Sequence, residues 1–128
     1  MTVPSTSPMP DLQSVQTAVM NVCERAAAGD LEARIADTES FGPLAPLLDS
    51  INHLLDVTDA FVRESSASLA FASQGKYWRP FLLRGMPGDF RRAARVIDAA
   101  RVAMERRHNL TDAFQQTVAH VVGVVSHA

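Results

Sequence analysis

Apolar residues recur every three or four positions along three stretches of the chain. The first stretch runs from Asp11 to Gly29, the second from Pro43 to Gly75, and the third begins at Phe90 and continues almost to the last residue. This spacing places the apolar side chains on one face of an α-helix, and glycine commonly ends a helix because it accepts a left-handed backbone. The pattern therefore predicts an all-α protein with three helices.

The apolar face of the second stretch is too broad for a two-stranded contact, because Leu47, Leu54 and Phe61 widen it. A face of this width is typical of helices in four-helix bundles. One chain brings only two helices to each bundle, so we expect a second copy to supply the other two. The residues predicted to line the dimer core are Val19, Val22, Leu48, Ile51, Leu55, Phe90, Ile97, Met104, Phe114 and Val118.

The segments between the helices, residues 30–43 and 76–89, lack the alternation of a β-strand. We predict extended connectors, each long enough to return along a helix so that the helices before and after it run parallel. The third helix keeps its apolar seam close to the C-terminus without a capping signal, and we expect it to continue in a longer coiled coil. Residues 1–10, rich in Pro and Ser/Thr, are predicted to form a flexible tail.

The chain contains an internal repeat. An offset of 46 residues superimposes four pairs of identical residues, namely Ala26 and Ala72, Gly29 and Gly75, Gly42 and Gly88, and Ile51 and Ile97. The tetrapeptide at residues 58–61 recurs at 111–114, which is 53 residues later and so one heptad further along. Because a heptad insertion keeps the same helix face toward the core, the repeat predicts two helix-connector-helix units, the second longer than the first.

Composition excludes several classes of protein. The 128 residues are 47% apolar and 20% charged, with a formal net charge of −2. The basic residues are scattered among acidic ones, so we expect no nucleic-acid partner. The longest apolar run, residues 121–125, is far too short to cross a bilayer, and the N-terminus lacks the features of a signal peptide. With a single cysteine and hence no internal disulfide, the chain is predicted to be cytoplasmic.

Three sequence segments, AAGDLEARI at 27–35, ESFGPL at 39–44 and IN at 51–52, together resemble the HAMP signal-relay domain. This family forms parallel dimeric four-helix bundles between the sensor and output domains of bacterial receptors. The resemblance implies a first HAMP-like unit at residues 11–58 and a second, divergent one at 59–110. Residues 111–128 resemble the start of the long signalling coiled coil of methyl-accepting chemotaxis proteins, and residues 51–64 resemble the N-terminal region of soluble chemoreceptors.

The resemblance implies a function as well as a fold. It indicates an N-terminal sensory, signal-relay and dimerisation module of a cytoplasmic chemoreceptor. We expect this module to be a homodimer and to have no membrane partner. Such a module passes a conformational change to a kinase-controlling output domain, which we expect beyond the C-terminus of this chain, and through it to the chemotaxis kinase and coupling protein. Gly29, Gly42, Gly75 and Gly88 are the candidate relay joints, because helices shift about such positions.

Catalysis finds little support in the sequence. The carboxylates are dispersed, no glycine-rich phosphate loop occurs, and no cysteine or histidine has the spacing of a nucleophile and its base. His120 and His127 lack the acidic, arginine-rich surroundings of a kinase phosphoacceptor. We therefore expect no enzymatic activity and no metal site.

Ligand sensing is the alternative hypothesis. Cys23 and His53 could ligate haem, although a lone cysteine is more often an apolar filler and His53 is expected near solvent. Tyr77, Trp78 and Arg79 could form a pocket for a planar or anionic small molecule, or could attach the second connector to the helices. Haem is the only cofactor that the sequence leaves open.

Overall fold

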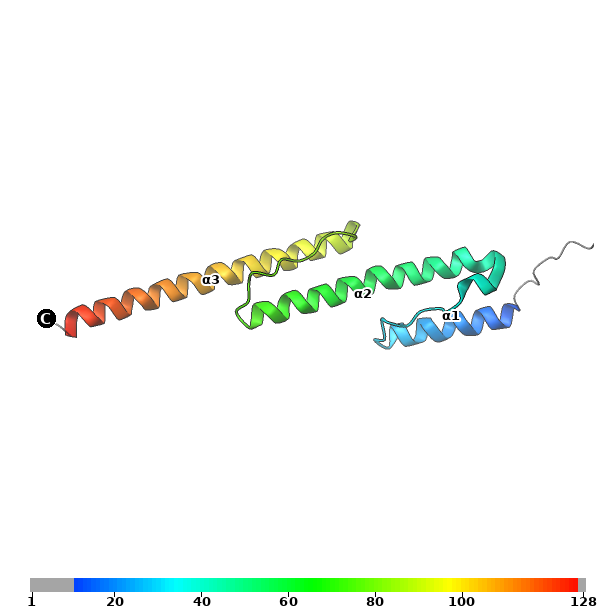
Figure 1. Ribbon diagram of the computed structural model, residues 1–128, viewed down its shortest axis with the longest axis horizontal. Helices are drawn as coiled ribbons and strands as arrows, with labels where there is room; N and C mark the ends of the chain where they lie inside the picture. The colour runs from blue at the N-terminus through cyan, green and yellow to red at the C-terminus, as the bar shows by residue number, and fades with distance from the viewer. Residues whose placement is uncertain (1–10, 127–128) are drawn as a thin grey trace, which may run out of the picture. The chain divides into compact units, whose positions relative to one another are not determined.

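The computed structural model describes residues 11–126, which contain helices and connectors but no strand (Figure 1). The three helices are α1 (Leu12–Ala27), α2 (Ala45–Ser73) and α3 (Gly88–Ser126). A short 3-10 segment, η1 (Thr38–Leu44), precedes α2 and is interrupted at Gly42. The all-helical prediction is confirmed for these residues. The flexible tail predicted at residues 1–10 lies outside the described part of the chain.

The first two helices end in the same way. After α1, Gly29 adopts a φ of 106° and the N–H of Asp30 donates to the carbonyl oxygen of Arg25 over 2.9 Å. After α2, Gly75 adopts a φ of 77° and the N–H of Lys76 donates to the carbonyl oxygen of Phe71 over 2.8 Å. This is the Schellman geometry, in which a left-handed residue lets the chain turn back and satisfies the last carbonyl groups of the helix.

The chain divides into two compact units, and the boundary between them falls within α2, after Ala60. Unit 1 holds α1, the first connector, η1 and the first part of α2. Unit 2 holds the rest of α2 from Phe61, the second connector and α3. Within each unit the connector doubles back along the preceding helix, so that the two helices run in the same direction, as predicted (Figure 1).

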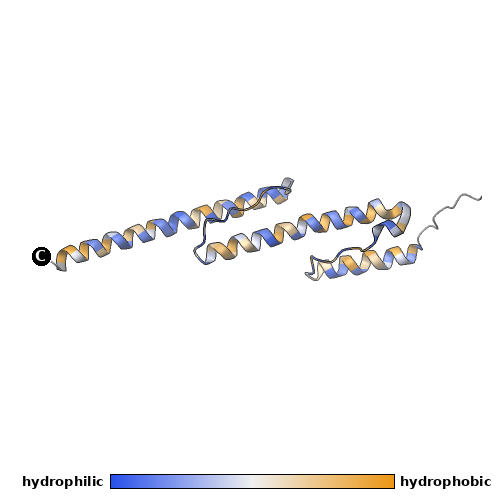
Figure 2. Cartoon of the chain, viewed as in Figure 1, coloured by the Kyte–Doolittle hydropathy of each residue, from blue (hydrophilic) through white to orange (hydrophobic). Residues whose placement is uncertain are grey.

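Each unit has its own apolar core, and apolar and polar residues are interspersed along all three helices (Figure 2). The core of unit 1 consists of Val15, Val22, Ala33, Ile35, Leu48 and Leu55. The core of unit 2 has fewer buried members, Phe81, Met86 and Ala94, with Phe61, Leu83, Phe90 and Ile97 packed against them. The ring of Phe61 lies 6.3 Å from that of Phe81 and 5.7 Å from that of Phe90, which ties α2 to both the second connector and α3.

None of the helices in residues 11–126 combines the length and the apolar character that crossing a membrane requires.

Candidate functional site

The connector of unit 1 is attached to α2 by one side-chain amide. The N–H of Ile35 donates to Asn52 Oδ1 over 2.8 Å, and Asn52 Nδ2 donates to the carbonyl oxygen of Ile35 over 3.0 Å. Arg34 adds an ion pair with Asp56 at 2.8 Å and a hydrogen bond to the carbonyl oxygen of Leu31. Because Asn52 satisfies both backbone groups of Ile35, the connector is fixed at a single register.

The connector of unit 2 is attached at the equivalent place by a carboxylate. The N–H of Phe81 donates to Asp98 Oδ1 over 3.1 Å. Phe81 and Asp98 lie 46 residues after Ile35 and Asn52. The offset found in the sequence therefore relates residues that occupy the same structural positions. Asp98 was not among the predicted site residues, although the offset from Asn52 could have identified it.

Charged side chains hold the rest of this connector. Arg101 donates to Asp98 over 3.0 Å and also to the carbonyl oxygen of Tyr77. Hydrogen bonding by the Phe81 N–H, aided by Arg101, holds the pKa of Asp98 below its ordinary value, although partial burial acts in the opposite direction. The connector of unit 2 thus depends on an ionised carboxylate.

A second charged cluster fixes the middle of the same connector. Arg79 pairs with both carboxylate oxygens of Glu64, at 2.9 and 3.0 Å, and the N–H of Leu82 donates to Glu64 Oε1 over 3.1 Å. The side chains of Glu64 and Arg79 are only 13% and 23% exposed. A paired guanidinium and carboxylate with this little exposure form a strong, geometrically specific link between α2 and the connector.

The predicted relay joints all have a positive φ, namely 106° at Gly29, 58° at Gly42, 77° at Gly75 and 52° at Gly88. A β carbon at any of these four positions would meet no neighbouring atom within 4 Å. The preference for glycine therefore comes from the backbone conformation and not from lack of space. Their role as relay joints stays a prediction.

The predicted dimer core divides into two groups. Val22, Leu48 and Leu55 are buried within a single chain, and Val19, Ile51, Phe90 and Ile97 pack against the cores of their own units, while Met104 is half-buried. Phe114 and Val118 are instead exposed in the single chain, together with Val121 and Val125. The seam at the end of α3 therefore has no partner within the described chain.

The haem hypothesis gains no convergent ligands. Cys23 on α1 and His53 on α2 are both exposed. Residues 11–126 contain no group of three or more His, Cys, Asp or Glu side chains that could hold a metal ion. Haem binding at Cys23 or His53 stays a prediction.

The three residues proposed for a ligand pocket point to different neighbours. The Tyr77 ring lies 5.5 Å from that of His108 on α3, whereas the Trp78 ring lies 5.6 Å from that of Phe71 on α2. Arg79 is engaged by Glu64. These contacts favour the reading in which the residues attach the connector to the helices, and binding of a small molecule by them stays a prediction.

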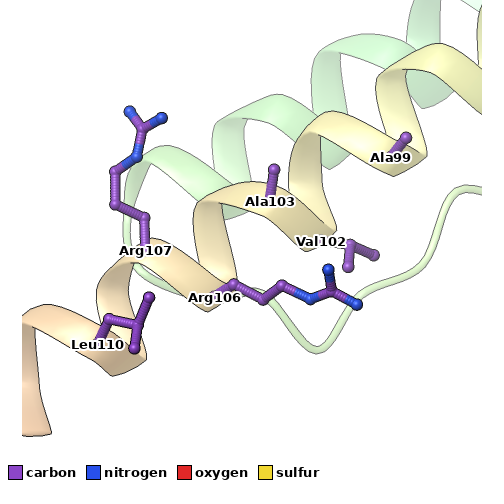
Figure 3. A pocket seen from close by; sticks show the side chains of 6 residues that line it. All are labelled: Ala99, Val102, Ala103, Arg106, Arg107 and Leu110. Carbon is purple, nitrogen blue, oxygen red and sulfur yellow. The ribbon is translucent and has the colours of Figure 1, made fainter.

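Surface hollows lie along α1 and along α3, and another lies where the second connector meets α3, beside Gly85, Met86, Pro87 and Arg91. Figure 3 shows one of those on α3, an open groove lined by six residues of that helix: Ala99, Val102, Ala103, Arg106, Arg107 and Leu110. His120 borders another groove on the same helix, and His127 lies outside the described residues. A groove along one helix is a surface that a neighbouring protein can cover, and it does not enclose a small molecule.

The two units carry opposite net charge. The prediction that basic residues are scattered evenly among acidic ones was therefore wrong. Residues 1–60 contain two basic and nine acidic side chains, a net charge of −7. Residues 61–128 contain ten basic and five acidic ones, a net charge of +5. Counting charges by unit instead of over the chain would have revealed the separation, because the sum of −2 conceals it.

Comparison with known proteins supports a chemoreceptor relationship. The chain is 41% identical, over 88 residues, to a methyl-accepting chemotaxis protein of Paramagnetospirillum magneticum. The match covers 69% of this chain and 20% of that protein, so the chain spans about a fifth of its relative's length. No family model matches the chain, and no solved structure matches it. The matching part of the chain is thus a region related to a methyl-accepting chemotaxis protein.

Proposed function

We propose that the chain is a signal-relay and dimerisation module of a cytoplasmic chemoreceptor. Two copies align in parallel, and each unit contributes two helices to a HAMP-like four-helix bundle. The repeated helix-connector-helix unit, with both helices running in the same direction, supports this architecture. The similarity to a methyl-accepting chemotaxis protein supports the chemoreceptor assignment.

The observation that carries the proposal is the exposed seam at the end of α3. Phe114, Val118, Val121 and Val125 are 68%, 43%, 53% and 69% exposed. Their spacing of four, three and four residues is that of the core positions of a coiled coil. A continuous apolar stripe of this kind marks an interaction site, and a second copy of the same helix fits it in register.

The relay runs through the connectors and the shared helix. A displacement of α1 in unit 1 changes the packing of α2, which continues into unit 2 without interruption. The glycine joints allow the connectors to adapt while the clamps at Asn52 and Asp98 keep each connector on its helix. Through α3 the change reaches an output region that controls the chemotaxis kinase together with its coupling protein, and the module itself has no catalytic role.

Disulfide trapping tests the parallel dimer. In a Cys23→Ala background, Val118→Cys is expected to form an interchain disulfide quickly under mild oxidation, because two seam positions face each other in a parallel coiled coil. Gln116→Cys is the matched control, since Gln116 lies on the opposite side of α3 and should react much more slowly. Sedimentation of the unmodified chain should give the mass of a dimer. A monomer at all concentrations, or equal trapping of both variants, would contradict the proposal.

A further inference from the structure

The second connector presents a regular outward face. From Lys76 to Arg84 its side chains alternate between exposed and inward positions. The exposed set, here called the ridge, consists of Lys76, Trp78, Pro80, Leu82 and Arg84, and Trp78 and Leu82 are 71% and 60% exposed. The ridge therefore has an apolar centre between two basic ends.

The ridge is held in place from behind. Glu64 binds the inward side chain of Arg79 and the backbone N–H of Leu82, and Asp98 binds the backbone N–H of Phe81. The Trp78 ring packs against that of Phe71 at a tilt of 43°, and Lys76 Nζ lies 5.6 Å from the centre of the same Phe71 ring. A rigid, pre-oriented tryptophan loses little conformational entropy when it binds, and tryptophan is enriched among the residues that dominate protein interfaces.

Unit 1 shows that the fold does not require an apolar ridge. Forty-six residues earlier, the positions of Lys76, Trp78 and Leu82 are occupied by Asp30, Glu32 and Ala36. All three are exposed. The same backbone thus carries an acidic outward face in one unit and an apolar face with basic ends in the other, so the fold does not require the Trp78 and Leu82 side chains.

Charge complementarity identifies the occupant. Unit 1 has a net charge of −7 and unit 2 of +5. If the dimer is parallel and in register, an inference that rests on the proposed function, like units lie beside like units and the opposite charges do not meet within the interface. They meet when unit 2 of one dimer approaches unit 1 of another.

Unit 1 offers a matching surface on α1. Met20 is 58% exposed, and Glu24 lies four residues later on the same helix face. This face lies away from Val15 and Val22, which are buried in the core of unit 1. A thioether packs well against an indole ring, and the carboxylate of Glu24 can pair with a basic end of the ridge.

We propose that the ridge binds the Met20 and Glu24 face of α1 in a second dimer, so that dimers associate through unlike units. The contact is small, and interfaces of less than about 1,200 Å² are typical of weak, transient association. Because the two surfaces carry opposite charge, the association is steered by charge and weakens as salt rises from about 0.05 to about 0.5 M.

Trp78 is the only tryptophan of the chain and reports on the ridge directly. On concentrating the full chain, we expect its emission to shift to the blue as sedimentation reveals species larger than the dimer. Trp78→Glu and Leu82→Ala, which install the unit 1 residues, should remove these species and leave the dimer intact. Their persistence in both variants would overturn the inference, as would an emission shift that does not depend on concentration.

A charge exchange identifies the partner surface. Glu24→Lys should weaken association beyond the dimer by about tenfold or more, as expected for losing a close interfacial charge pair. Adding Lys76→Glu should restore most of it, whereas Glu39→Lys, an equal change of charge elsewhere on unit 1, should have a much smaller effect. Equal effects of Glu24→Lys and Glu39→Lys would contradict the assigned face.

Two further outcomes separate this inference from its alternatives. A blue shift of Trp78 with vesicles of phosphatidylglycerol and phosphatidylcholine, at chain concentrations without association beyond the dimer, would assign the ridge to anionic lipid and overturn the proposed occupant. Failure of Val118→Cys to crosslink would contradict the parallel dimer. In that case ridge-dependent association of monomers would still support the contact between unlike units, and its absence would exclude both proposals.

Discussion

The two units have the same backbone plan but attach their connectors with different chemistry. In unit 1 the neutral amide of Asn52 makes the central contact, whereas in unit 2 the carboxylate of Asp98 does so with help from Arg101. At the position of Arg101, unit 1 has the buried Leu55. The comparison shows that the same connector position can be held by a neutral amide or by a carboxylate, and only the carboxylate contact changes its own charge with pH.

The cores differ in the same sense. Leu48 in unit 1 corresponds to Ala94 in unit 2, and both residues are fully buried. Val22 corresponds to Ser68, a fully buried residue whose hydroxyl has no hydrogen-bond partner within the described structure. A buried hydroxyl without a partner costs about 1–3 kcal/mol. Unit 2 therefore has the smaller apolar contribution and an added penalty, and we expect it to be the more easily rearranged unit.

The largest expected effect comes from exchanging core residues between the units. Leu48→Ala should reduce the free energy of unfolding by about 2–5 kcal/mol, because it leaves a cavity in a tightly packed site. Ala94→Leu should also destabilise, by about 1–3 kcal/mol, because the core of unit 2 has closed around the smaller side chain. Denaturant titration measures the loss, and hydrogen exchange resolved by residue assigns it to one unit. Stabilisation by Ala94→Leu would show that unit 2 has spare volume.

A smaller effect is expected from the ion pair of unit 2. Glu64→Ala leaves the guanidinium of Arg79 partly buried without its partner and should destabilise by about 1–3 kcal/mol. Unit 1 has alanine at both equivalent positions, Ala18 and Ala33. The double variant with Arg79→Ala should therefore lose less than Glu64→Ala alone. A double-mutant cycle measures this coupling, and strictly additive losses would contradict a specific pair.

The smallest effect is the pH dependence that Asp98 gives to unit 2. The pKa of Asp98 is lowered in the folded chain, chiefly by the N–H of Phe81, so its contribution is complete above the unfolded value of about 4 and is lost as the pH falls through the folded value. Asp98→Asn should flatten the acid limb of the stability curve relative to the unmodified chain. Asn52→Asp should not steepen it, because one carboxylate oxygen would then face the carbonyl oxygen of Ile35, to which Asn52 Nδ2 donates in the unmodified chain. Identical acid limbs in the unmodified chain and Asp98→Asn would exclude Asp98 as a contributor.

Much of the fold follows from local pattern. Glycine and helical periodicity place α1, α2 and α3, because a helix depends on neighbours three and four residues away. The internal repeat likewise follows from residue identities alone. These signals sufficed for the architecture within a unit.

The charged contacts of unit 2 could not be predicted from local pattern. Glu64 binds Arg79 across 15 residues and Tyr77 meets Arg101 across 24, and no periodicity encodes such pairs. The motif shared by residues 58–61 and 111–114 also misleads on burial, because Phe61 packs in the core of unit 2 whereas Phe114 is exposed. Identical local sequence takes different environments when different segments pack against it.

Because α2 belongs to both units, the chain has no linker between them in which length can vary freely. Gain or loss of a single residue between Leu55 and Phe61 would turn every later side chain of the helix by about 100°. Such a change would present polar residues to one core or the other. Descendants of this gene can therefore accept insertions in the two connectors far more readily than in the middle of α2, where spacing between the units is inherited as a fixed count of residues.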